Sequence, residues 1–148
     1  LTHDLKQSKI SIIGIKDTPG IASKIFKPIG EAGIIVDMIV QNISTKGETD
    51  LTFTVPKEDL NKTVKILQNN KSKLSYSSLI KDEKIALVSI VGAGMKTHTG
   101  IATRMFTSLA KAKINISMIS TSEIKISCVI NQSQCKKAIT SLHKEFGL

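Results

Sequence analysis

Two short glycine-containing stretches share one order of residue types and could hold a small charged ligand. One reads Pro19-Gly20-Ile21-Ala22-Ser23-Lys24-Ile25-Phe26, and the other reads Thr99-Gly100-Ile101-Ala102-Thr103-Arg104-Met105-Phe106. Each places a glycine at the start of a helical pattern, where backbone N–H groups are free and the partial charge is positive, which suits a carboxylate. Glycine also lets the backbone approach a ligand without a Cβ in the way.

A zwitterion would also need an acceptor for its ammonium group. Asp17 and Asp37 are the candidates beside the first stretch, whereas Ser117 stands at the position that corresponds to Asp37 in the second copy. This difference predicts two sites with different ligands or different strengths. The alternative stays open that these residues only shape turns and cap helices.

The sequence contains no clear motif for catalysis, metal binding or nucleotide binding. His3, His98 and His143 are far apart and fit no triad or metal-ligand spacing, although His98 falls in the second loop. Gly92-Ala93-Gly94 begins like a dinucleotide loop, but Thr97 stands where the third glycine belongs. We therefore expect no catalytic residue, no metal site and no phosphate-binding loop.

Composition and charge exclude several classes of partner. The chain has 148 residues and a net charge of +9, but only 3% aromatic residues, so a nucleic-acid surface that combines clustered basic residues with aromatic ones is not predicted. No apolar run approaches the ~18 residues of a membrane span. Cys128 and Cys135 fit no metal spacing and are expected to be core thiols, which is compatible with the cytoplasm.

The repeat extends well beyond the glycine stretches and predicts two copies of one small domain. At a constant spacing of 80 positions, four apolar residues recur downstream: Ile34, Val36, Met38 and Ile39 correspond to Ile114, Ile116, Met118 and Ile119. We place the domains at residues 8–81 and 82–148.

Each copy is predicted as a β-α-β-β-α-β unit. In the first copy, strands are expected at 9–15, 34–43, 50–55 and 74–80, with a helix from Pro19 that Pro28 should kink and Gly33 should end, and another at 57–70. In the second copy, strands are expected at 85–91, 114–121 and 124–130, with helices at 101–113 and 135–146. The hairpin tip is expected at Lys46-Gly47.

The second copy has no final strand, and we expect residues 1–7 or an upstream segment to cover that sheet edge. The predicted fold class is α+β. It comprises two ferredoxin-like domains, each an antiparallel sheet with two helices on one face.

Three further motifs carry a family resemblance that covers nearly the whole chain. They are Gln41-Asn42-Ile43-Ser44, Val91-Gly92-Ala93-Gly94-Met95 and Ile119-Ser120-Thr121-Ser122-Glu123-Ile124. The repeat resembles a pair of ACT domains, and the motifs resemble the regulatory region, or beta subunit, of bacterial aspartate kinase. That family phosphorylates aspartate with ATP on the way to lysine, threonine and methionine.

The resemblance implies feedback regulation by amino acids. The family's kinase domain, to which ATP and Mg would belong, is not in this sequence, so the chain should be inactive alone and need no cofactor. Its implied partners are L-threonine, L-lysine, a second copy in a homodimer, and the catalytic domain or alpha subunit of the kinase. It would be either an excised regulatory region or a separate small subunit.

The resemblance also implies two effector sites between the first domain of one chain and the second domain of its partner. The threonine-type site would use Asp17, Gly20, Ile21, Ala22 and Gln41, with Asn115 and Ile116. The lysine-type site would use Ile35, Val36 and Asp37, with Thr121, Ser122 and Glu123. Ile35 stands where many relatives have Asn, so only a backbone contact is expected there, and lysine binding is less secure than threonine binding.

Three alternatives remain on the sequence. One is an ACT pair that serves another enzyme or a transcription regulator. Another is a catalytic domain of the acylphosphatase kind, which would want an Arg in a loop that offers only Lys16 and Asp17. The third is a plain dimerisation module without a ligand.

Overall fold

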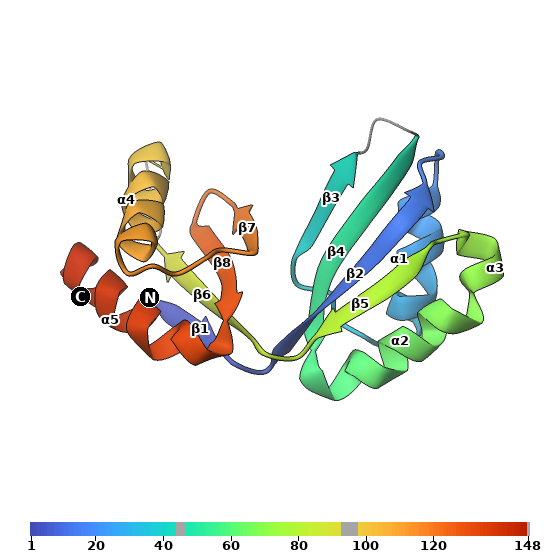
Figure 1. Ribbon diagram of the computed structural model, residues 1–148, viewed down its shortest axis with the longest axis horizontal. Coiled ribbons are helices and arrows are strands. Elements are labelled where there is room, and N and C mark those ends of the chain that lie inside the picture. The colour runs from blue at the N-terminus through green and yellow to red at the C-terminus, as the bar shows by residue number, and fades with distance from the viewer. Residues whose placement is uncertain (44–46, 93–97, 148) are drawn as a thin grey trace. The chain divides into compact units, whose positions relative to one another are not determined.

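The computed structural model describes residues 1–43, 47–92 and 98–147, and the chain divides into two compact units (Figure 1). The first module is Gln7–Glu83, and the second module combines Leu1–Lys6 with Lys84–Leu148.

The first module is a four-stranded antiparallel sheet with helices on one face (Figure 1). Its strand order is β3-β4-β2-β5, and these strands are β2 (Gln7–Lys16), β3 (Ile39–Ile43), β4 (Glu48–Pro56) and β5 (Ser78–Asp82). The helices are α1 (Ile21–Glu31), the 3-10 turn η1 (Lys57–Asp59), α2 (Leu60–Asn69) and α3 (Lys71–Leu74). Alternate residues of β2 and β4 pack against the apolar stripes of α1 and α2, with Ile10, Phe53, Ile25 and Leu67 fully buried.

The second module repeats this order, but its fourth position is filled from the start of the chain. Its sheet runs β1-β6-β8-β7, with β1 (Thr2–Asp4), β6 (Ile85–Val91), β7 (Met118–Thr121) and β8 (Lys125–Asn131). Its helices are α4 (His98–Lys111), η2 (Gln132–Gln134) and α5 (Cys135–Phe146). Thr2 pairs with Ser89 and Asp4 with Leu87, so β1 covers the edge of β6 that β5 covers on β2. The predicted fold class of two ferredoxin-like α+β domains is confirmed.

Some predicted strands begin too early. The strand expected at 34–43 begins at Ile39, and the strand expected at 114–121 begins at Met118. The strand expected at 74–80 is Ser78–Asp82, because Leu74 closes α3. A left-handed turn at Ser75, with φ 52°, follows α3, and Lys113 after α4 is also left-handed, with φ 59°; neither is a glycine that would have signalled the turn.

The two glycine-led helix starts also differ from the prediction. Helix α1 begins at Ile21, after a left-handed Gly20 cap with φ 84°, so Pro19 lies outside the helix rather than at its first position. Helix α4 begins at His98, so Gly100 lies inside its first turn. The two glycines are therefore not equivalent. Helix α1 continues past Pro28 to Glu31.

Several expectations lie outside the described residues. They concern residues 93–97 of the second loop, Ser44 and Lys46 of the hairpin, and the side chains of His98 and Thr99.

Both cysteines are buried free thiols, as predicted. Burial raises the pKa of Cys128 to about 12, and burial also raises the pKa of Cys135. Among the described helices, none is long and apolar enough to cross a membrane.

Candidate functional site

The start of α1 offers unpaired backbone donors. Among the described residues, no side chain caps this helix, and its first turn contains no acidic residue. The Ile21 N–H donates to the Thr18 carbonyl at 3.2 Å, whereas the N–H groups of Ala22 and Ser23 have no acceptor among the described residues. A carboxylate is the natural ligand for such donors, because the N-terminal end of a helix is partially positive.

The turn before this helix is held against the β3–β4 hairpin. The Asp17 N–H donates to the Gly47 carbonyl at 2.9 Å, and Gly47 itself is left-handed with φ 73°. The Asp17 side chain is exposed and has no ionic partner among the described residues. Its carboxylate is therefore available to an ammonium group near the donors of α1.

Strand β3 brings Gln41 to the same end of the module. Strands β2 and β3 both pair antiparallel with β4, so they run in the same direction and end on the same side of the sheet. Gln41 is exposed near the end of β3, and Asp17 follows the end of β2. The threonine-type residues of the first module thus gather at one end of its sheet.

The lysine-type residues of the first module lie at the other end. They belong to the segment between α1 and β3, where Ile35 is 74% exposed and Val36 is half-buried. The Asp37 N–H donates to the Thr54 carbonyl at 3.1 Å, and the Asp37 carboxylate is exposed without an ionic partner in the described chain.

The second module separates its two residue sets in the same way. Asn115 and Ile116 precede β7, and Thr121, Ser122 and Glu123 follow or end it. The equivalent of Asp37 is Ser117, whose hydroxyl donates to the Val129 carbonyl at 3.2 Å. Ser117 therefore offers a hydroxyl already bonded within the module where the first module offers an open carboxylate.

The threonine-type and lysine-type residues lie beside β3 in the first module and beside β7 in the second, and both strands are edge strands of their sheets. In the described part of the chain, β3 and β7 have a neighbour on one side only. Ile39 on β3 is 52% exposed, and Ile119 on β7 is 44% exposed. Exposed apolar residues on an unpaired edge are typical of a surface that another strand or chain covers.

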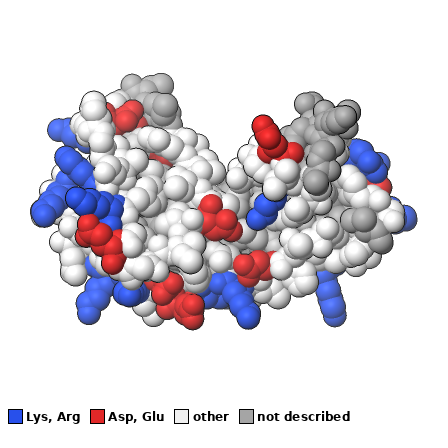
Figure 2. Space-filling view, turned by 180° about the vertical axis from the view of Figure 1, so that it is seen from behind, with Lys and Arg blue, Asp and Glu red and all other residues white. Residues whose placement is uncertain are grey.

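Charged side chains of both signs lie on the face drawn in Figure 2. Several Lys and Arg side chains lie next to one another at the left edge of the view, and Asp and Glu side chains are scattered between the other basic ones. The expectation that no nucleic acid is bound stays a prediction.

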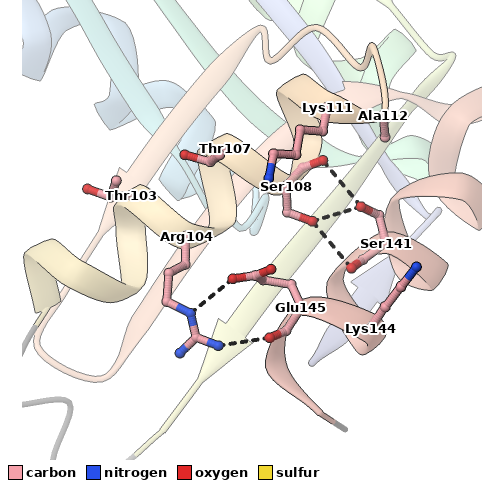
Figure 3. Close-up of a pocket in the computed structure, with 9 residues that line it drawn as sticks. All are labelled: Thr103, Arg104, Thr107, Ser108, Lys111, Ala112, Ser141, Lys144 and Glu145. Atoms are coloured by element: carbon pink, nitrogen blue, oxygen red, sulfur yellow. Dashed lines mark hydrogen bonds and ion pairs between the residues drawn. The ribbon is translucent and has the colours of Figure 1, made fainter.

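A pocket of about 580 Å³ lies between α4 and α5 of the second module, and none of the predicted site residues lines it (Figure 3). Across it, the Ser108 and Ser141 hydroxyls lie 2.7 Å apart, and the Arg104 Nε contacts the Glu145 Oε1 at 3.1 Å. These side chains satisfy one another across the two helices. The two serine hydroxyls are hydrogen-bonded to each other and to the backbone carbonyls of the facing helix, so we assign the pocket no chemistry.

Two residues that the sequence pattern did not single out meet near the end of β2: Gly14 of that strand and Asp50 of β4. The Gly14 N–H donates to Asp50 Oδ1 at 2.9 Å, where the pairing of β2 with β4 shifts between Ile12 and Ile15. A signal for this irregularity was present, because an isolated glycine in a strand pattern indicates a bulge.

Comparison with known proteins identifies the family of the chain. The profile of the ACT domain matches residues 10–70 and 88–146. An aspartate kinase of Pseudomonas fluorescens is 50% identical over 142 residues, which are 96% of this chain and 34% of that protein. An aspartokinase of Mycolicibacterium smegmatis is 41% identical over 150 residues, which are 100% of this chain and 36% of that protein. The chain therefore spans about a third of the length of these relatives.

Two solved structures match it along nearly their whole length. The crystal structure of aspartokinase alpha and beta subunits has a TM-score of 0.93 and 41% identity, and the match covers 99% of this chain and 97% of that chain. The ligand-free regulatory subunit of aspartate kinase from Thermus thermophilus has a TM-score of 0.92 and 35% identity, with 98% and 95% covered.

Proposed function

This chain belongs to the ACT domain family, as the regulatory region of an aspartate kinase, and we propose that it senses free L-threonine and L-lysine for feedback inhibition of that kinase. The proposal concerns the ligands, the dimer and the inhibition. The kinase reaction itself would belong to a catalytic domain or alpha subunit with its own ATP and Mg.

The observation that carries the proposal is the pairing of opposite charges at the start of α1. Free N–H groups of Ala22 and Ser23 suit the carboxylate of an amino acid, and the open carboxylate of Asp17 suits its ammonium group. Both lie in one short segment, which the Asp17–Gly47 hydrogen bond fixes to the hairpin. Gln41, on the same end of the sheet, would add a side-chain amide for a hydroxyl such as that of threonine.

A partner chain would complete both sites at once. The threonine-type and lysine-type residues lie at opposite ends of β3, and their counterparts in the second module lie at opposite ends of β7. If β3 of one chain faces β7 of its partner in antiparallel orientation, Gln41 comes near the partner's Asn115. The same arrangement brings Asp37 near the partner's Glu123. The exposed isoleucines on both edges favour such a contact.

The second site favours a ligand with an additional positive charge. Asp37 and Glu123 are both exposed carboxylates without an ionic partner in the described chain. Together they would surround the ε-ammonium of lysine. Ile35 offers only its backbone to this ligand.

Regulation follows if the ligand prefers one arrangement of the modules. A ligand held between two chains stabilises the arrangement in which both contribute residues, and a kinase joined to them would be held in a less active state. Couplings of this kind are typically about 1–3 kcal/mol. A ligand that bound every arrangement equally would not inhibit, however tightly it bound.

Calorimetric titration of this chain with L-threonine and L-lysine tests the proposal. We expect saturable binding of L-threonine, with D-threonine as the control for stereochemistry and L-valine as the control for the hydroxyl. Sedimentation should show a dimer that the ligand stabilises. If neither amino acid binds at millimolar concentration, alone or together, the assignment of effectors fails.

A further inference from the structure

We propose that Asp50 is a positioning residue that sets the conformation of the segment from Gly14 to Gly20, and through it the affinity for the amino acid. Asp50 belongs to β4 and is not among the residues proposed to touch the ligand. The effect on affinity rests on the proposed function, whereas the effect on the segment can be tested without any ligand.

The bulge in β2 creates a donor that the sheet itself does not satisfy. Strand β2 pairs regularly with β4 as far as Ile12, and the pairing resumes at Ile15 after a shift. Within the shift Gly14 is left-handed, with φ 71°, and its N–H donates to Asp50 Oδ1 at 2.9 Å. A bulge leaves its extra residue outside the ladder, and a carboxylate is a strong acceptor for the freed N–H group.

The bulge determines which way the following residues face. Ile10, Ile12 and Ile15 are all fully buried, although Ile15 lies an odd number of positions after Ile12. In a regular strand this spacing would place the two side chains on opposite faces. The extra residue therefore reverses the alternation just before Lys16 and Asp17, so the orientation of the proposed ammonium ligand depends on the bulge.

A second contact holds the bulge from its other side. The Ser77 N–H donates to the Ile13 carbonyl at 2.8 Å, and a Cβ on Gly14 would collide with the Ser77 hydroxyl. Beyond the bulge, Ile15 pairs with Thr49, and the Asp17 N–H reaches the Gly47 carbonyl. The hydrogen bond from Gly14 to Asp50 is thus the first of a short series of contacts along this segment, and the last of them is at Asp17 in the proposed site.

The second module provides an internal comparison. Ile90 pairs with Ile126 as Ile12 pairs with Leu51, so Lys125 is the counterpart of Asp50 and Gly92 the counterpart of Gly14. The Gly92 N–H donates to the Ile124 backbone carbonyl at 2.9 Å. No side chain is needed there, so Lys125→Ala is a matched control for Asp50→Ala.

Amide hydrogen exchange, followed by NMR in the ligand-free protein, tests the positioning. Asp50→Ala should speed exchange at Gly14 and Asp17 by tenfold or more. Asp50→Asn should stay within about threefold of the wild type, because its amide oxygen can still accept the bond. Lys125→Ala should change neither amide. The proposal is overturned if Asp50→Ala leaves both amides as protected as in the wild type, or if Asp50→Asn loses the protection as fully as Asp50→Ala.

Calorimetry with L-threonine on the same proteins tests the consequence for binding. We expect the Kd to rise at least fivefold in Asp50→Ala and to stay near the wild-type value in Asp50→Asn, while the Kd of L-lysine is unchanged in both. A wild-type Kd in Asp50→Ala would reject the effect on affinity. If the wild-type chain binds neither amino acid, the proposed function fails, and the exchange rates alone decide the positioning role.

Discussion

Asp17 and Asp37 are anchored at opposite ends of strand β4. The Asp17 N–H bonds to the carbonyl of Gly47, and the Asp37 N–H bonds to the carbonyl of Thr54. The two acceptors are seven positions apart along the chain, which corresponds to roughly 23 Å at the usual rise of a strand. One amino acid is far too short to reach both carboxylates, so they cannot serve the same ammonium group.

The first prediction is that the two carboxylates act on different ligands. Asp17→Ala should weaken L-threonine by about 2 kcal/mol, because it removes a charged hydrogen-bond partner. Asp37→Ala should weaken L-lysine and leave L-threonine unchanged. Calorimetry on both variants, with the exposed Glu58→Gln as control, measures the two effects. Loss of both ligands in either variant would contradict independent sites.

The second prediction compares two left-handed glycines. Gly20→Ala adds only the conformational cost of a Cβ, about 1 kcal/mol, because no atom of the described residues lies within 4 Å of that Cβ position. Gly14→Ala adds a collision with the Ser77 hydroxyl and should cost at least about 2 kcal/mol. Urea unfolding measures both, and Ser77→Gly should restore part of the loss in Gly14→Ala. Equal losses in the two single variants would argue against the collision.

The third prediction concerns the first strand. Removing residues 1–6 should destabilise the second module, because β6 would lose the partner that pairs with Leu87, Val88 and Ser89. Amide exchange at Leu87 and Ser89 should accelerate. Exchange at Ile12, in the first module, serves as the control and should not change. Unchanged protection along β6 would mean that β1 adds little to the sheet.

The fourth prediction is a loss of stability in alkali that depends on Cys128. Burial raises the pKa of Cys128 from 9.0 to about 12, so above pH 9 the unfolded chain releases a proton that the folded chain keeps. Stability from this group is therefore full below pH 9 and declines as the pH rises toward 12. Between pH 8 and pH 10, the wild type should lose about 1 kcal/mol more unfolding free energy than Cys128→Ala. If the unfolding free energies of the wild type and Cys128→Ala fall in parallel between pH 8 and pH 10, the prediction is refuted.

The fifth prediction concerns the contact of Arg104 with the end of α5. Its guanidinium pairs with Glu145 and lies 4.4 Å from the centre of the Phe146 ring. The ion pair is half-exposed, so Arg104→Ala should reduce stability by no more than about 1 kcal/mol. Arg104→Lys should recover little of this, because an ammonium cannot reproduce the paired contact. A loss of unfolding free energy above about 2 kcal/mol in Arg104→Ala would contradict this prediction.

The core is the part of the fold that the sequence reveals most directly, because the spacing of apolar residues matches the buried faces of the strands and helices. Ile10 and Ile12 alternate as a half-buried strand requires, and Ile21, Ile25 and Ile29 lie on the buried stripe of α1. The helix expected at 135–146 has the bounds of α5.

Left-handed conformations at non-glycine residues, and the partners of an irregular strand, could not be predicted. Ser75 and Lys113 take left-handed conformations that their residue types do not indicate. The bulge at Gly14 needs an acceptor from another strand, and sequence spacing alone does not reveal that Asp50 supplies it. The candidate site is harder still, because half of it would come from another chain.

The placement of β1 has a consequence for anything fused ahead of Leu1. The first module follows immediately in the sequence, but residues 1–6 belong to the second module because β1 pairs with β6. A force applied at Leu1 would therefore act first on the second module, although the first module is the nearer one in the sequence. Residues 7–83 behave as an insertion within a protein that begins and resumes around them.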